Sequence, residues 1–153
     1  MKPGARGFTL IELMVVVALI AIASALASLA LRDPAATRLE HEGARLVALL
    51  EAARTEARAA GLTASWEPRA EQQGAEGFRF VGLPPGTEMP NRWLSAGVSA
   101  EVPGARAVKL GPEPLIGAQR IVLHLDTQSL TLATDGLGPF VVVDPDPAAA
   151  PRS

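Results

Sequence analysis

The sequence contains no cysteine, so no disulfide bond can stabilise any part of it. An exported domain of this size often uses disulfides, so the folded part must depend on its own core or on neighbours in an assembly. The formal net charge is only −2, and no basic patch indicates a nucleic-acid partner. The 153 residues leave room for one membrane helix and one small domain.

Charged side chains are nearly absent from the 24 residues between Phe8 and Leu31. The exceptions to apolar character there are Thr9, Glu12, Ser24 and Ser28. A helix of this length extends about 36 Å, more than the ~30 Å of a bilayer's hydrocarbon layer. The run also exceeds the ~7–15 apolar residues of a cleaved secretory signal. It therefore predicts a transmembrane helix over residues 8–31.

Two cations and no acid precede this run, namely Lys2 and Arg6. The positive-inside rule then predicts a cytoplasmic N-terminus and an exported C-terminal part. Glu12 does not fit a lipid-embedded helix, since a buried charge costs roughly 2.5–3.5 kcal/mol on insertion scales. Such an acid indicates either a functional role or a position shallow enough to reach the headgroups.

The segment Gly7-Phe8-Thr9-Leu10-Ile11-Glu12-Leu13, with its apolar continuation to Ala23, resembles the N-terminal signature of type IV pilins and of type II secretion pseudopilins. The resemblance implies that a prepilin peptidase cuts between Gly7 and Phe8 and then methylates the new amino terminus of Phe8. Residues 1–7 become a cleaved leader, and Glu12 becomes the fifth residue of the mature chain. The mature side chains are two charges more negative than the full chain's −2.

The implied cleavage gives Glu12 a partner. Opposite charges ~4 Å apart attract by about 4 kcal/mol at an effective dielectric constant near 20, and an unpaired acid in lipid would otherwise bind a proton. The Phe8 ammonium of a neighbouring subunit could pair with Glu12 and select one axial register in a filament. A pair within one chain is equally compatible with the spacing, because positions i and i+4 share a helix face.

A second helix is predicted after a kink at Arg32-Asp33-Pro34, since proline disfavours helix for the residue before it. Residues 32–60 form this continuation, with regular helix from Ala35 to Ala60 and a stop at Gly61. One face of it is apolar and predicts packing on a sheet; it consists of Leu39, Leu46, Leu50, Ala53 and Ala57. The pattern places Arg38, Glu42, Arg54 and Arg58 on other faces.

Residues 61–143 change character and predict a small antiparallel β domain. The expected strands are Thr63–Glu67, Gly77–Gly82, Val98–Val102, Ala107–Leu110, Arg120–Leu125, Ser129–Thr134 and Pro139–Val143. A hairpin is expected at Asp126-Thr127-Gln128 and a turn at Asp135-Gly136. The tail 144–153 is rich in proline and alanine and is predicted to be disordered. The fold class is therefore α+β, with the strands in one sheet or two.

Scattered positions after residue 45 resemble the minor pseudopilin H of type II secretion. They comprise Leu46–Gly61, Leu110–Pro114, Gln119–Leu123 and Leu132–Phe140. The resemblance implies a helix followed by two β-sheets and a place near the tip of a pseudopilus. The lack of cysteine disfavours the type IV pilins that close a C-terminal loop with a disulfide.

Two groups of residues suggest chemical sites, but their spacing disfavours both. His124, Asp126 and Ser129 suggest a hydrolase, but the sequence has no G-x-S-x-G elbow. Asp126, Asp135, Asp144 and Asp146 offer oxygen ligands for calcium without EF-hand spacing. Trp66, Trp93, Phe78, Phe80 and Phe140 are expected in the core or an interface, and His41 on an exposed helix face. No enzymatic activity, metal or cofactor is predicted.

The prediction is a non-enzymatic minor pseudopilin of a type II secretion pseudopilus, anchored in the inner membrane with its domain in the periplasm. Its expected partners are the prepilin peptidase, the other minor pseudopilins, the major pseudopilin and the inner-membrane secretion platform. One alternative is a minor type IV pilin. Alternatives of other classes are a single-pass membrane protein with a periplasmic ligand-binding domain and an anchored hydrolase.

Overall fold

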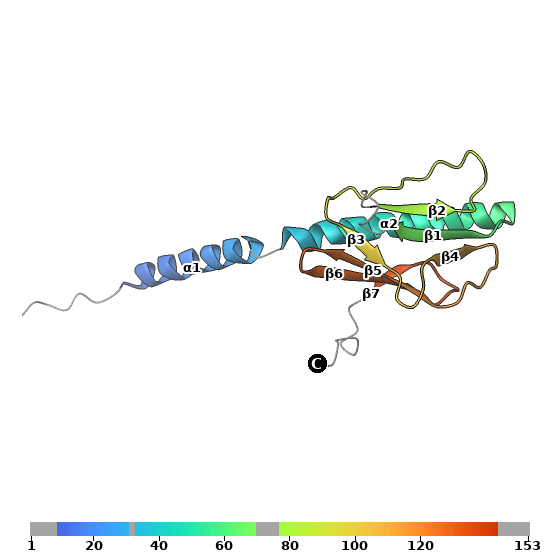
Figure 1. The fold of residues 1–153 in the computed structure, drawn as a ribbon. Coiled ribbons are helices and arrows are strands. Elements are labelled where there is room, and N and C mark those ends of the chain that lie inside the picture. The colour runs from blue at the N-terminus through green and yellow to red at the C-terminus, as the bar shows by residue number, and fades with distance from the viewer. Residues whose placement is uncertain (1–8, 31–32, 70–76, 144–153) are drawn as a thin grey trace, which may run out of the picture. The chain divides into compact units, whose positions relative to one another are not determined.

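The computed structural model describes residues 9–30, 33–69 and 77–143, with the side chains of residues 26–30 excepted. The chain divides into two compact units, Met1–Asp33 and Pro34–Ser153. The first unit contains helix α1, Leu10–Ala30. The second contains helix α2, Pro34–Ala60, and all the strands (Figure 1). The leader 1–7, Phe8, the end of the predicted span and the tail 144–153 lie outside the described residues.

Helix α2 begins and ends where the sequence predicts, within one residue. Asp33 is not helical and Pro34 is the first helical residue, a position at which the missing N–H of proline loses no hydrogen bond. At the other end Gly61 has φ +64°, Leu62 N donates to Ala57 O at 3.0 Å, and Gly61 N donates to Arg58 O at 3.2 Å. These two bonds are the Schellman arrangement, in which a glycine adopts the left-handed conformation after the last turn.

All seven predicted strands are present, each within two residues of its expected ends. They are β1 Ala64–Arg69, β2 Gly77–Val81, β3 Ser99–Glu101, β4 Val108–Gly111, β5 Gln119–Leu125, β6 Gln128–Thr134 and β7 Val141–Val143. They form two antiparallel sheets, one with the order β2-β1-β4 and the other β3-β5-β6-β7. The open question of one sheet or two is answered, and the chain crosses between the sheets three times, after β2, after β3 and after β4.

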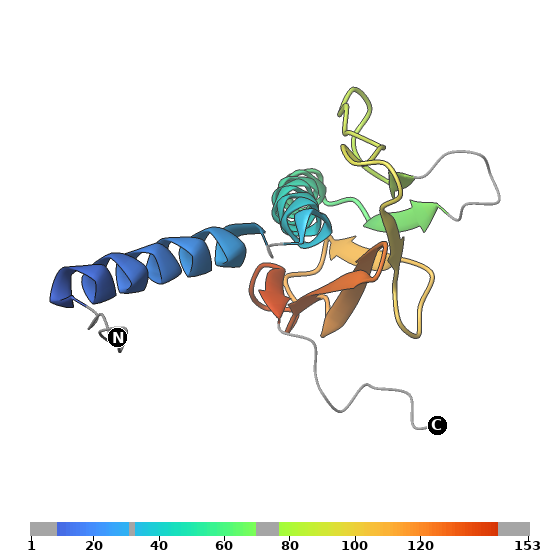
Figure 2. The same ribbon diagram turned by 90° about the vertical axis from the view of Figure 1, so that its left-hand side faces the viewer.

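Helix α2 packs on both sheets through the predicted apolar face. Leu39, Leu46, Leu50, Ala53 and Ala57 are at most 2% exposed. On the sheet side, alternate residues of β5 point inward, and Ile121, Leu123 and Leu125 are buried. Figure 2 looks nearly along α2 and shows both sheets on one side of it. One contiguous core therefore joins the helix to two sheets that share no hydrogen-bonded edge.

The aromatic side chains cluster under the sheet formed by β1 and β2. Trp66 and Phe78 are fully buried with ring centroids 5.9 Å apart, and Trp93 meets Phe78 edge-on at 4.7 Å. Phe80 contacts Phe78 at right angles at 6.0 Å, and Phe140 is buried elsewhere in the core. Such pairs contribute about 0.5–1.5 kcal/mol beyond the area that they bury, and they confirm these residues as core anchors.

Candidate functional site

The candidate functional site is the N-terminal segment around Gly7, Phe8 and Glu12. Gly7 and Phe8 lie outside the described residues, and Glu12 lies in the first turn of α1. Thr9 caps this helix: its Oγ1 accepts a hydrogen bond from Glu12 N at 3.3 Å, and its carbonyl accepts one from Leu13 N at 3.2 Å. The sequence interpretation overlooked this cap, although Thr9-x-x-Glu12 is the pattern of a capping box.

Glu12 is exposed, and its position suits a negative charge. The N-terminus of a helix carries roughly half a positive charge, so a carboxylate in the first turn is stabilised there. Within residues 9–30 and 33–69 no cation forms an ion pair with Glu12. Its predicted partner, the amine of Phe8, belongs to a residue that is not described. The pairing of Glu12 with Phe8 therefore remains a prediction.

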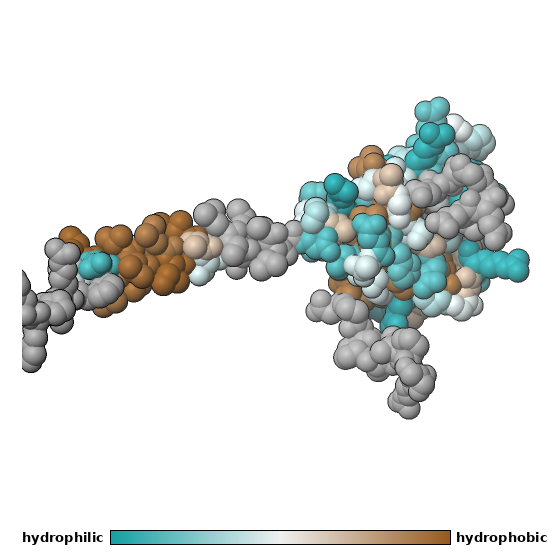
Figure 3. Space-filling model, turned by 60° about the vertical axis from the view of Figure 1, so that its left-hand side comes forward, coloured by the Kyte–Doolittle hydropathy of each residue, from teal (hydrophilic) through white to brown (hydrophobic). Residues whose placement is uncertain are grey.

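Around α1, the side chains that the structure describes are apolar in nearly every direction, and all of them are exposed. Ten large apolar side chains are between 41% and 78% exposed: Leu10, Ile11, Leu13, Met14, Val15, Val16, Val17, Leu19, Ile20 and Ile22. Figure 3 shows the resulting apolar surface on the side of α1 that faces the viewer. A helix that is apolar all round is stable only when other apolar groups surround it. Among the residues that the structure describes, no helix is long and apolar enough to cross a membrane.

Two charged residues of α2 are buried, and the prediction that they lie on outer faces of the helix is wrong. Glu42 is 1% exposed, and its Oε1 accepts hydrogen bonds from Leu94 N at 2.7 Å and Ser95 N at 2.6 Å. Helical periodicity does place Glu42 on the apolar face, three residues after Leu39 and four before Leu46. Only the structure shows the loop, about fifty residues further along the chain, that covers the carboxylate. Glu42 therefore attaches the connection between β2 and β3 to the helix.

Arg54 does the same for the connection between β6 and β7. Its side chain is 2% exposed, and Nη1 donates to Gly138 O at 2.8 Å and to Glu51 Oε1 at 3.1 Å. The sequence pattern did place Glu51 three residues before Arg54, where the two side chains can meet. Arg54 Nε and Nη2 are buried without a hydrogen-bond partner among the described residues. Because two nitrogens of this buried guanidinium group have no hydrogen-bond partner, loss of the bond from Nη1 to Gly138 O would be costly.

The hydrolase residues do not form a triad. His124 and Ser129 are opposite each other across β5 and β6, but His124 Nε2 lies 3.5 Å from Glu101 Oε1 on the neighbouring strand. Asp126 lies beyond the end of β5, in the expected hairpin turn, with φ +53°. A catalytic aspartate would have to orient the histidine, and Asp126 makes no hydrogen bond to His124 in the described part of the chain.

The calcium residues are not brought together either. Asp126 and Asp135 flank opposite ends of β6, about 20 Å apart at the usual rise along a strand. Asp135 Oδ1 accepts hydrogen bonds from Gly138 N at 2.8 Å and Leu137 N at 2.9 Å, which lower the pKa of its carboxyl below the usual 3.8. The expected turn at Asp135-Gly136 is thereby confirmed. Asp144 and Asp146 lie outside the described residues, and the described ones include no group of three acidic or histidine ligands.

Two comparisons with known proteins found a match, one to a family and one to a solved structure. Residues 2–28 match the family described as the prokaryotic N-terminal methylation motif. The fold is similar to the crystal structure of the type IV minor pilin FimU of Pseudomonas aeruginosa, with a TM-score of 0.53 and 13% sequence identity over 71% of this chain and 90% of that one. A search of curated proteins found no match. The predicted α+β pilin-like fold is confirmed, and the chain carries a prepilin-type N-terminal methylation motif.

Proposed function

We propose that this chain is a minor pseudopilin of a type II secretion pseudopilus, made as a precursor and assembled through α1. The observation that supports the proposal most strongly is the exposed apolar surface of α1, most of which lies within the matched methylation motif. In a filament, the α1 helices of neighbouring subunits would cover these side chains from all sides. Before assembly the lipid of the inner membrane would cover them, with the globular unit in the periplasm.

Each residue of the site has a separate role in this proposal. Gly7 is the last residue of the leader and allows the peptidase to cut before Phe8. Phe8 provides the N-methylated amine, and Glu12 provides the carboxylate that this amine meets in the same or the next subunit. An ion pair in an apolar surrounding has only one favourable geometry, because misplaced charges remain unpaired and desolvated. The pair would therefore fix the axial stagger of neighbouring subunits. The other proposed partners of the chain are the peptidase, the other pseudopilins and the secretion platform.

A minor type IV pilin is the second candidate, and the likeness of the fold to a type IV minor pilin is compatible with it. The N-terminal motif belongs to both kinds of filament. Deleting the gene in its host separates the two candidates. A pseudopilin mutant should fail to export folded proteins across the outer membrane and keep its surface pili. A pilin mutant should lose pili and keep export.

Processing tests the site directly. The native protein should lack residues 1–7 and carry one methyl group on Phe8, as intact mass and N-terminal sequencing would establish. Gly7→Ala should leave the precursor uncut, whereas Gly4→Ala, a matched change within the leader, should be processed normally. A native chain that still begins at Met1 would refute the proposal.

Assembly tests the acid separately from processing. Glu12→Val should be cleaved and methylated normally but enter filaments at roughly a tenth of the normal amount or less, if the loss is about 1.4 kcal/mol per subunit. Glu40→Val, on the exposed face of α2, is the matched control. If the Glu12 and Glu40 variants entered filaments equally, the proposed role of Glu12 in assembly would be wrong. The proposal that the chain is cleaved after Gly7 would not be affected.

A further inference from the structure

The face of the β2-β1-β4 sheet that is turned away from α2 carries most of the basic side chains of the strands. Trp66, Val108 and Leu110 are buried on the inner face, whereas Arg79 and Lys109 are exposed on the outer one. Arg69 belongs to the same outer row, because it alternates with the inward Pro68 and is directly opposite Gly77. Directly opposite residues of antiparallel strands point to the same face.

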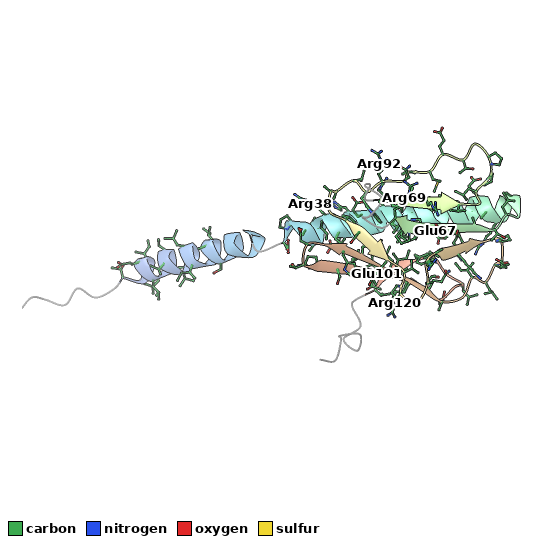
Figure 4. The ribbon with its side chains drawn as sticks, in the orientation of Figure 1. Arg38, Glu67, Arg69, Arg92, Glu101 and Arg120 are labelled. Atoms are coloured by element: carbon green, nitrogen blue, oxygen red, sulfur yellow. The ribbon has the colours of Figure 1, made fainter. Side chains whose placement is uncertain are left out.

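A cleft of about 590 Å³ lies where this face meets β3 and the connection that follows β3. Its charged lining consists of Glu67, Arg69 and Arg79 from the first sheet and Glu101 and Arg106 from the other wall. Figure 4 shows Glu67 and Arg69 on β1 and Glu101 on β3. Pro68, Ala100 and Val102 supply apolar surface between the charges.

The charges in this cleft do not balance. Arg79 forms an ion pair with Glu67: its Nη2 and Nε lie 2.6 Å and 2.8 Å from Glu67 Oε2. Glu101 has His124 beside it at 3.5 Å, on the next strand. Arg69 and Arg106 are exposed and have no acidic partner within residues 33–69 and 77–143. Two guanidinium groups are therefore available to carboxylates, which they can hold with paired hydrogen bonds.

The wall formed by β3 adds a second recognition element. β3 is an edge strand whose single neighbour within its sheet is β5. Ala100 and Glu101 of this strand line the cleft. Edge strands present backbone N–H and C=O groups that an extended peptide can pair with, and such pairing supplies affinity while side-chain sites supply specificity.

We propose that this cleft binds an extended acidic segment of a partner polypeptide, which adds to the edge of β3 and places its carboxylates on Arg69 and Arg106. A peptide fits better than a compact polyanion, because the two glutamates of the cleft repel dense negative charge while the apolar residues between the charges accommodate a chain. The inference goes beyond the proposed function and applies to either kind of filament. It also does not depend on cleavage after Gly7.

Binding of a defined probe to the full-length chain in non-ionic detergent tests this proposal. The probe is a fluorescent octapeptide of alternating glutamate and valine, and its binding is measured by fluorescence anisotropy. It should bind about tenfold more tightly than the same peptide with glutamine in place of glutamate, a difference of ~1.4 kcal/mol, and binding should weaken as salt is added. Methylating alternate backbone nitrogens of the probe should also weaken binding, because strand pairing is then blocked.

Variants locate the binding. Arg69→Gln combined with Arg106→Gln should reduce affinity about tenfold or more, whereas Arg38→Gln, an exposed arginine on α2 shown in Figure 4, should leave it unchanged. Unaltered tryptophan fluorescence would show that the double variant is folded. Equal affinity of the double variant and the parent would overturn the proposal. The proposal would also be overturned if the probe bound only after Glu71→Gln and Glu76→Gln were introduced, because the chain's own acids would then be the ligand.

Discussion

The two helices of this protein have similar lengths, 21 residues in α1 and 27 in α2, but opposite relations to their surroundings. α2 has one apolar face, and that face is almost completely buried against the sheets. α1 is apolar on nearly all faces, and its described large apolar side chains are at least 41% exposed. Burying apolar surface contributes roughly 25 cal/mol per Å². The globular unit obtains this energy from within the chain, whereas the described side chains of α1 would gain it through contact with other apolar groups.

This comparison separates what stabilises each unit. Pro34–Ser153 should fold and unfold through its own core, and Met1–Asp33 should affect assembly without affecting that equilibrium. Both tryptophans of the chain, Trp66 and Trp93, belong to the globular unit. Tryptophan fluorescence during unfolding in guanidinium chloride and non-ionic detergent therefore reports on this unit alone.

The largest difference between the units is expected from matched truncations of leucine. Leu50→Ala, at a fully buried position, should lower the free energy of unfolding by about 2–5 kcal/mol, because it loses burial and leaves a cavity. Leu19→Ala, at a position 61% exposed in α1, should change it by less than about 0.5 kcal/mol. Similar losses for both variants would show that α1 contributes to the globular fold.

A smaller but still large effect is expected for the buried acid of α2. Glu42→Ala should destabilise the globular unit by about 3 kcal/mol, because two hydrogen bonds to a charged group are lost and Leu94 N and Ser95 N are left without an acceptor. Glu40→Ala, two residues away and exposed, is the control and should stay within about 0.5 kcal/mol of the parent. If the two variants are equally stable, Glu42 does not hold the loop.

The smallest effect is the pH dependence due to Asp135. Its folded-state pKa lies below 3.8 because Gly138 N and Leu137 N donate hydrogen bonds to the ionised carboxylate. A lowered folded-state pKa stabilises the protein above the unfolded-state pKa, and this contribution disappears as the pH falls through the folded-state value. The stability difference between the parent and Asp135→Asn should thus be constant near neutral pH and shrink below about 3.8. Parallel stability profiles down to the lowest pH measured would contradict this role.

Much of the fold could be predicted because its signals are local. The helical repeat of Leu39, Leu46 and Leu50, the glycine after Ala60 and the alternation in β5 each depend on a few neighbouring residues. Apart from the β5–β6 hairpin, the partners of the strands could not be predicted, because β1 pairs with both β2 and β4 while β3 pairs with the distant β5. Such pairings depend on which surfaces meet after the chain collapses. The same holds for the cleft that β1 and β3 help to form.

The sequence by itself determined that residues 8–31 are apolar on every side, that one acid interrupts them, and that an amphipathic helix and short strands follow. These properties depend on composition and on periods of two or about 3.6 residues, which are visible within a single segment. Only the tertiary structure decided which loops the buried Glu42 and Arg54 bind and that the strands form two sheets. Burial of a polar side chain requires a partner from a distant segment, and no local pattern records where that segment comes to lie.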